Sequence, residues 1–249
     1  MIQAIITQPR VSPGVAFGSP IGFGASGGDY FIGLNGATAD NADAPGADND
    51  FIGDIALDGS LTAGIGLGNP RTALGVELAV NVTSLRDDFG DSGSVALKIH
   101  RLIGPRGALS IGTENDIAWG DVKDVVDATT GTRFVSYSHY FQLRDDPVNP
   151  GGLMITVGIG DGRLGKRSDP EDPAPFASIG YAFTRQISAI VDYSGEATNI
   201  GLSVVPWRHL PISAVFGATD VGERRGDTEF AFGIGYSMPL LTVYAKEPR

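Results

Sequence analysis

The sequence predicts an all-β fold: an antiparallel up-and-down transmembrane β-barrel of about 12–14 strands. Large apolar residues alternate with small or polar ones over many windows, as side chains on a strand point alternately to two faces. Most of the expected strands have about 8–11 residues, the length that crosses a bilayer when a strand is tilted. The face opposite the apolar one holds mainly Gly, Ala, Ser and Thr, whereas a water-facing sheet surface is usually richer in charge.

The window 229–237 shows the pattern most clearly. Phe230, Phe232, Ile234 and Tyr236 alternate with small or polar residues, so one strand face is apolar and the other is thin. The same alternation predicts strands over 14–25, 29–37, 51–67, 73–83, 93–102, 107–118, 133–143, 152–160, 174–184, 187–194, 199–206, 211–218 and 228–237. The range 51–67 is either one long strand or two joined at a Asp58-Gly59 turn, and 240–245 is a candidate last strand.

The chain is expected to form one domain. Residues 1–13 are interpreted as an N-terminal extension, 14–245 as the barrel and 246–249 as a short C-terminal tail. Apolar residues at helical spacing never persist, and glycine interrupts nearly every window. Short and long connections alternate through most of the chain, as in outer-membrane barrels, but this alternation fails around 194–211.

A soluble antiparallel β-sandwich is the alternative fold, because a sandwich strand also has one apolar face, turned inward. Aromatic residues near the ends of the expected strands favour the membrane barrel, since such residues form girdles at membrane interfaces. These residues are Tyr30, Phe183, Tyr193, Trp207, Phe230 and Tyr236.

Composition excludes several classes of function. The formal net charge of −11 argues against nucleic-acid binding, which needs a cationic face. The absence of cysteine excludes disulfides, thiolate metal sites and cysteine nucleophiles. The first ten residues lack a basic start and a long apolar core, so no secretory signal is visible. The expected location, the bacterial outer membrane, therefore refers to a mature chain.

Two segments carry a resemblance to a known family. The windows SPGVAFGSP (12–20) and GLSVVPWR (201–208) are similar to barrel proteins predicted in cyanobacteria. Over nearly its whole length the chain resembles bacterial outer-membrane β-barrels of the porin-like type. The resemblance implies a membrane-spanning barrel. Such barrels usually end on an aromatic residue, whereas this sequence ends with Lys246, Glu247, Pro248 and Arg249.

The candidate functional residues lie on the polar faces of the expected strands and would line the lumen. They are Glu77, Asn81, Lys98, His100, Glu114, Asp192, Asn199 and Glu229. If 73–83 pairs with 93–102, Glu77 and Lys98 become near neighbours. Ionised side chains inside a barrel need water or each other, so they would line an aqueous channel or form salt bridges in a filled interior. We hold two interpretations open. One is a channel for small polar solutes or ions. The other is a structural or assembly β-protein, either a filled barrel or a soluble envelope or filament subunit, that uses its acidic loops for contacts.

Three other features of the sequence could suggest a catalytic or binding site. The window 160–165 fits GxGxxG, but the residues that follow do not favour a helix, so a surface loop is expected. Ser138 and His139 have no visible third partner, and we expect no enzyme. We also expect no cofactor; the acidic loops 40–54 and 84–92, Asp145 with Asp146, and Asp169 to Asp172 are either Ca²⁺ candidates or contact surfaces. The expected partners are the lipid bilayer, small polar solutes and, as an open alternative, a second copy of the chain.

Overall fold

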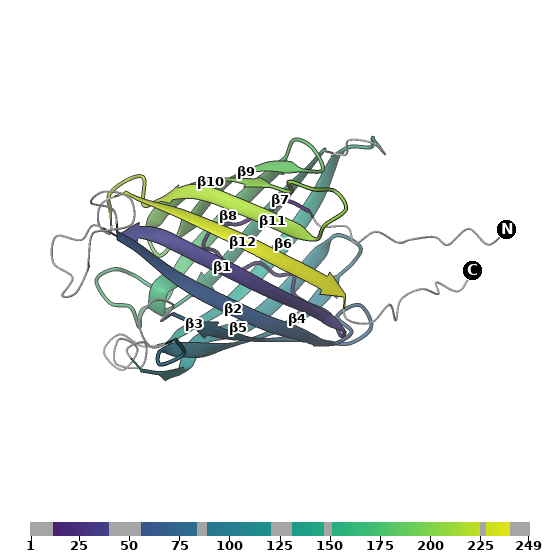
Figure 1. Ribbon diagram of the computed structural model, residues 1–249. Coiled ribbons are helices and arrows are strands. Elements are labelled where there is room, and N and C mark those ends of the chain that lie inside the picture. The colour runs from purple at the N-terminus through teal and green to yellow at the C-terminus, as the bar shows by residue number, and fades with distance from the viewer. Residues whose placement is uncertain are drawn as a thin grey trace.

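The chain folds into one closed barrel of antiparallel strands (Figure 1). The computed structural model describes residues 12–39, 56–83, 89–120, 131–146, 151–224 and 228–239. The strands are β1 (Asp29–Ala39), β2 (Ala56–Gly68), β3 (Gly75–Val82), β4 (Gly93–Ile103), β5 (Gly107–Trp119), β6 (Thr132–Arg144), β7 (Gly151–Gly160), β8 (Ala174–Ala182), β9 (Ile187–Ser194), β10 (Ala197–Val204), β11 (Ile212–Thr219) and β12 (Glu229–Pro239). Each strand pairs with its neighbours in sequence, and β1 closes the barrel on β12. The antiparallel up-and-down β-barrel predicted from the sequence is thus confirmed, with 12 strands.

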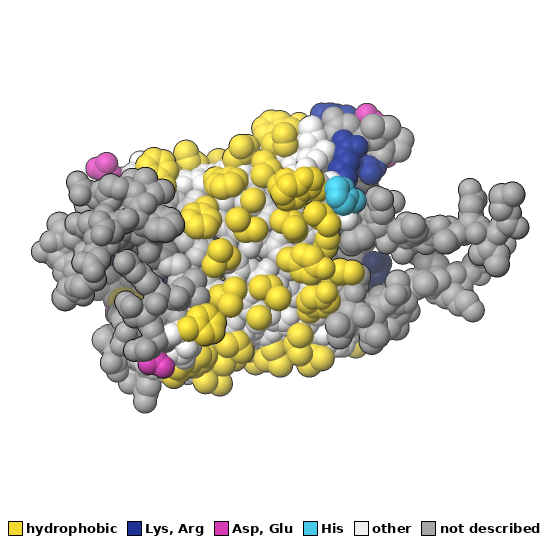
Figure 2. Space-filling view, viewed as in Figure 1, with side chains coloured by type: hydrophobic (Ala, Val, Ile, Leu, Met, Phe, Trp, Pro, Cys, Tyr) yellow, Lys and Arg dark blue, Asp and Glu magenta, His cyan; other side chains and the backbone are white. Residues whose placement is uncertain are grey.

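The alternating residues place apolar side chains on the outside of the barrel, where they form a band around its middle (Figure 2). Ile111 on β5 and Val157 on β7 keep 57% and 50% of their surface exposed. We call this band the apolar belt; it consists of Ile32, Leu34, Ile65, Leu67, Leu78, Val80, Leu109, Ile111, Val135, Val157, Ile159, Ile179, Val191, Ile200, Leu202, Phe216 and Ile234. A sandwich would bury these faces between two sheets, so the sandwich alternative is wrong.

The register arranges the belt in rows that cross the strands. Ile99 on β4 lies opposite Ile111 on β5, which lies opposite Val135 on β6, and Val135 lies opposite Ile159 on β7. Directly paired residues of an antiparallel ladder point to the same face, so each row is a continuous apolar strip. A one-residue slip would turn every one of these side chains into the lumen, which fixes the register.

The two ends of the barrel differ in the length of their connections. We call the end that holds the turns after β2, β4, β6, β8 and β10 the short-turn end; β1 starts and β12 ends there. The opposite, long-loop end holds the connections after β1, β3, β5, β7 and β11, and one exception. Gly195 and Glu196 alone join β9 to β10, with φ of 57° and 66°, as a type I′ hairpin turn requires. This turn explains why the alternation of loop lengths fails there.

The strand expected over 14–25 is wrong. Residues 12–28, which we call the N-terminal segment, form no strand and instead lie inside the barrel, against strands from β2 round to β11. Pro13 and Pro20 cannot donate the N–H that a central ladder needs, so the segment is poorly suited to pair as a strand.

The sequence leaves two expectations about strands open, the region 51–67 and the candidate last strand 240–245. β2 runs through Asp58 and Gly59 without turning, which confirms the single-strand interpretation of that region. Residues 51–55 and 240–245 lie outside the described ranges. No described helix is long and apolar enough to span a membrane; the helical element present is the short 3₁₀ helix η1 (Gly162–Leu164) in the β7–β8 connection.

Candidate functional site

The lumen wall from β5 to β7 is built from small hydroxyl side chains. Ser110, Ser136, Ser138 and Thr156 point inward and keep 2% or less of their surface exposed. The Oγ atoms of Ser110 and Ser136 are 2.8 Å apart, and Ser138 Oγ is 2.7 Å from Thr156 Oγ1. These hydroxyls therefore satisfy one another across the strands, as buried polar groups must.

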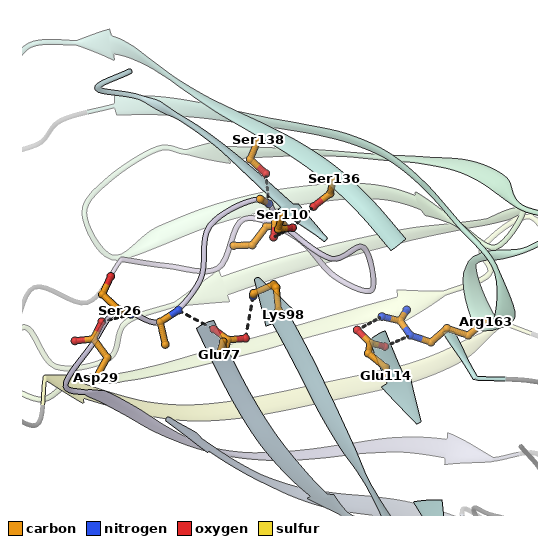
Figure 3. Close-up of polar contacts among 12 residues, drawn as sticks. Ser26, Asp29, Glu77, Lys98, Ser110, Glu114, Ser136, Ser138 and Arg163 are labelled. Carbon is orange, nitrogen blue, oxygen red and sulfur yellow. Dashed lines mark hydrogen bonds and ion pairs between the residues drawn. The ribbon is translucent and has the colours of Figure 1, made fainter. Parts of the chain in front are cut away.

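The N-terminal segment is seated on this wall by its backbone. Gly22 N donates to Ser138 Oγ at 2.8 Å, and Gly14 N donates to Ser203 Oγ on β10 at 2.7 Å. Ser110 Oγ in turn donates to the carbonyl of Ile21 at 3.3 Å (Figure 3). Because the segment belongs to no ladder, its backbone groups need side-chain partners, and the small polar wall supplies them.

Asp192 on β9 is the strongest anchor of the N-terminal segment. The carboxylate is fully buried and accepts hydrogen bonds from Phe17 N at 3.2 Å, Ser19 N at 3.0 Å and Ser19 Oγ at 2.9 Å. Asn199 on β10 adds a bond from Nδ2 to the Phe17 carbonyl at 3.3 Å. Hydrogen bonds to an ionised acceptor are stronger than neutral ones, so this carboxylate compensates its burial by holding the segment.

Close approach also requires glycine at two contacts. A Cβ on Gly22 would overlap the carbonyl oxygen of Ala108 on β5 and reach 2.9 Å from Ser138 N. A Cβ on Gly66 of β2 would overlap the backbone of Ala25 and Ser26. The segment and the wall therefore fit together at backbone distance at two separate places, on β5–β6 and on β2.

Two ion pairs lie inside the barrel (Figure 3). Glu77 on β3 and Lys98 on β4 occupy paired positions, and Lys98 Nζ is 2.9 Å from Glu77 Oε1. The proximity expected from strand pairing is thus present. Glu77 Oε2 also accepts a 2.7 Å hydrogen bond from Ala25 N of the N-terminal segment. Glu77 therefore binds both Lys98 on the neighbouring strand and the backbone of the N-terminal segment.

The second pair joins the β7–β8 connection to the wall. Arg163 binds Glu114 on β5 through two nitrogens, at 2.7 and 3.2 Å, and Arg163 Nη1 donates to the Gly18 carbonyl at 2.7 Å. The next residue, Leu164, is fully buried between Phe134 and Phe176. The window 160–165 is thus a loop, as expected, but it does not lie wholly at the surface. Leu164 packs inside the barrel against Phe134 and Phe176, and Arg163, still 41% exposed, binds Glu114 on the inner wall.

The N-terminal segment and the β7–β8 connection do not cover the inner wall of the barrel equally on all strands. Inward-facing Ser178, Ser188 and Ser203 on β8 to β10 are, like the wall described above, almost fully buried. Asn35 on β1 is exposed, although it faces inward beside Gly233, and Thr62 on β2 is half-buried. We call this less covered part, around Asn35 on β1, Thr62 on β2 and Asn81 on β3, the open side of the lumen. Nearer the short-turn end, β2 and β3 contact the N-terminal segment through Gly66 and Glu77.

The other predicted lumen residues take different positions. Asn81 faces inward on the open side and accepts a hydrogen bond from Thr62 Oγ1 at 2.8 Å. His100 is buried between Gly24 and Gly75, and Glu229 is exposed at the long-loop end of β12. The structure thus gathers Glu77, Lys98 and Glu114 near the segment, whereas Glu229 stands apart. Their role in conduction stays a prediction.

The Ser138–His139 motif is divided by the barrel wall. Ser138 points inward to Gly22, whereas His139 points outward, where its ring lies 4.6 Å from that of Phe141 and its Nδ1 is 3.1 Å from Tyr137 Oη. Neighbouring strand residues face opposite ways, so these two side chains cannot share a site.

Sequence reasoning missed Arg163 and the anchoring role of the serines. The available signal was serine at every second position, as in Ser136 and Ser138, which marks a small polar inner face. Within the described ranges, no group of three or more His, Cys, Asp or Glu side chains could hold a metal ion. The acidic loop 40–54 lies outside those ranges, so its Ca²⁺ alternative stays a prediction.

Comparisons with known proteins give little beyond the architecture. No protein-family model matches the chain, and no curated protein matches it. Among solved structures, the outer membrane protein Omp33 of Acinetobacter baumannii aligns with 86% of this chain and 100% of its own, at 10% sequence identity and a TM-score of 0.39. At that TM-score the likeness carries no functional information about this chain.

Proposed function

We propose that this chain is an outer-membrane barrel that conducts small polar solutes or ions through the open side of its lumen. The observation that supports it is the unequal cover of the inner wall: Asn35 is exposed, whereas Ser138 and Ser178 are buried. A barrel of this size that was filled throughout would bury its inward side chains on every strand.

The membrane part of this proposal rests on the outer surface. The apolar belt has members on every strand except β4, where the half-buried Ile99 continues one of its rows. A soluble protein rarely exposes so large an apolar area. Aromatic residues flank it, with Trp207 and Phe183 at the short-turn end and Phe230 at the long-loop end. Outer-membrane barrels have such girdles, with short turns on the periplasmic side and longer loops outside.

The charges beside the open side would set selectivity. Glu77 and Lys98 keep 18% and 16% of their side-chain surface exposed, and Glu114 and Arg163 keep 27% and 41%. A pair of opposite charges beside a narrow water path favours neither cations nor anions strongly. Removing one member leaves the other uncompensated, which should shift selectivity toward the opposite charge.

A structural or assembly barrel is the second candidate function. The hydrogen bonds that Asp192, Ser138 and Ser203 accept from the N-terminal segment favour it, because they hold that segment inside the barrel against β6, β9 and β10. In that case the ion pairs would serve only to satisfy buried charge.

Planar-bilayer recording separates the two candidates. We expect the refolded chain to conduct, Lys98→Ala to shift the reversal potential toward cation preference, and Glu77→Ala to shift it toward anion preference. The matched control is Lys166→Ala, since Lys166 pairs with Asp172 in the exposed β7–β8 connection. Opposite shifts are not expected from a purely structural pair. A chain that inserts into the bilayer without conducting would support the structural barrel instead.

A further inference from the structure

The cations at the two ends of the barrel are compensated differently. At the long-loop end, Lys166 is 2.6 Å from Asp172 and Arg133 is 3.3 Å from Asp116, so each has its own carboxylate. At the short-turn end, six described arginines face three described carboxylates, those of Asp29, Asp145 and Asp146. That end is thus locally cationic in a chain whose net charge is −11. Figure 2 shows dark blue side chains beside the belt at this end.

Three of these arginines lie on or beside two adjoining turns. Leu102 N donates to the Pro70 carbonyl at 2.9 Å, which places the β2–β3 turn against the end of β4. Arg71 and Arg101 are the chain neighbours of the two residues in that bond, and Arg106 lies in the following β4–β5 turn. We call Arg71, Arg101 and Arg106 the arginine cluster. All three are exposed.

None of the three guanidinium groups pairs with a carboxylate of the described chain. Arg106 Nη2 donates to the neutral Gln142 Oε1 at 3.1 Å, and no hydrogen bond or ion pair joins the side chain of Arg71 or Arg101 to a described residue. None of the three therefore makes a direct ion pair within the part of the protein that the structure describes; Asp145 lies near Arg106 but bonds the Nε2 of Gln142, at 3.0 Å.

Arg101 lies at the edge of the apolar belt. It pairs with Leu109, which points outward and is 45% exposed, so Arg101 also points outward toward the membrane. An outward arginine at that depth is favourable where its stem lies along lipid chains and its head reaches the headgroup layer. Phe141, 42% exposed, marks the same interface on β6.

We propose that the arginine cluster binds the phosphate of an anionic phospholipid whose acyl chains lie on the apolar belt. Guanidinium groups match phosphate oxygens in a planar, two-bond geometry, and anionic lipid headgroups attract basic side chains at the membrane surface. The site rests on the membrane assignment proposed above and names the lipid class that this end prefers.

Native mass spectrometry of the full chain in detergent, with equal amounts of phosphatidylglycerol and phosphatidylcholine, tests the proposal. The wild type should retain phosphatidylglycerol in excess. The variant Arg71→Gln, Arg101→Gln, Arg106→Gln should lose that excess several-fold, approaching equal retention. The control Lys166→Gln, Arg167→Gln, Arg224→Gln removes the same charge at the long-loop end and should keep the preference. Folding of each variant is checked by heat-modifiable gel migration.

Five outcomes would overturn the proposal. An unchanged preference in the cluster variant, or an equal loss in the control, would mean that no site exists at the cluster. Displacement of the lipid by excess inorganic phosphate would assign the cluster to soluble anions. Failure to insert into vesicles of either lipid would contradict the membrane assignment itself, whereas insertion without lipid preference contradicts only the cluster site.

Discussion

At the scale of single residues, Asp192 links the wall to the N-terminal segment. Its buried carboxylate accepts three hydrogen bonds, two from backbone N–H groups and one from Ser19 Oγ. We expect Asp192→Ala to destabilise the folded state by about 1–3 kcal/mol, because it leaves these buried donors without an acceptor. Asp192→Asn should cost less, since one oxygen remains. Urea unfolding in detergent, followed by gel migration, measures the difference.

The matched control for Asp192 is Asp172→Ala. Asp172 pairs with the cation Lys166, but its side chain is 48% exposed, and exposed ion pairs contribute little to stability. Limited proteolysis within residues 12–28 provides a second readout, because a released segment becomes accessible to protease. Equal stabilities for the two alanine variants would show that Asp192 does not anchor the segment.

At the scale of elements, the N-terminal segment depends on backbone contact with β5 and β6. A side chain at Gly22 would overlap the Ala108 carbonyl. We expect Gly22→Val to displace the segment at a cost of about 1–3 kcal/mol, because overpacking forces the backbone apart. The strands pair independently of it, so the barrel should still form. Single-channel conductance should rise, as the displaced segment uncovers the wall.

Gly33→Ala is the control for this element. Gly33 also faces the lumen, on β1, but its added Cβ would meet only the Ile234 carbonyl, at 3.9 Å. Conductance of this variant should match the wild type. A Gly22→Val barrel that conducts no more than the wild type would mean that the segment does not limit the passage.

The elements also show what the sequence could predict. Strand alternation is a local pattern, so it predicted β3 and β4. Because these two strands are consecutive in the sequence and pair, it also predicted the proximity of Glu77 and Lys98. The N-terminal segment escaped prediction because its partners are remote: Gly14 and Ser203 are 189 residues apart. Arg163 escaped for the same reason, since Glu114 lies 49 residues earlier in the chain. Only closure of the barrel brings these groups together.

At the scale of the whole molecule, the apolar belt distinguishes a membrane barrel from a soluble one. Ile111 lies in the middle of a belt row and is 57% exposed. In water, Ile111→Arg would change stability very little, since surface substitutions usually have small effects. In a bilayer, an arginine near the midplane costs about 2–4 kcal/mol. We therefore expect Ile111→Arg to lower the free energy of unfolding by about 2–4 kcal/mol when unfolding is measured in phospholipid vesicles.

Leu74→Arg is the companion measurement. Leu74 is 50% exposed, but it lies in the β2–β3 turn at the short-turn end, where an arginine reaches the headgroups and costs about 0–1 kcal/mol. The difference between the two variants therefore reports depth in the membrane rather than the chemistry of arginine. If both substitutions proved equally mild in vesicles, or if the wild-type chain stayed folded and soluble without detergent, the belt would not face lipid.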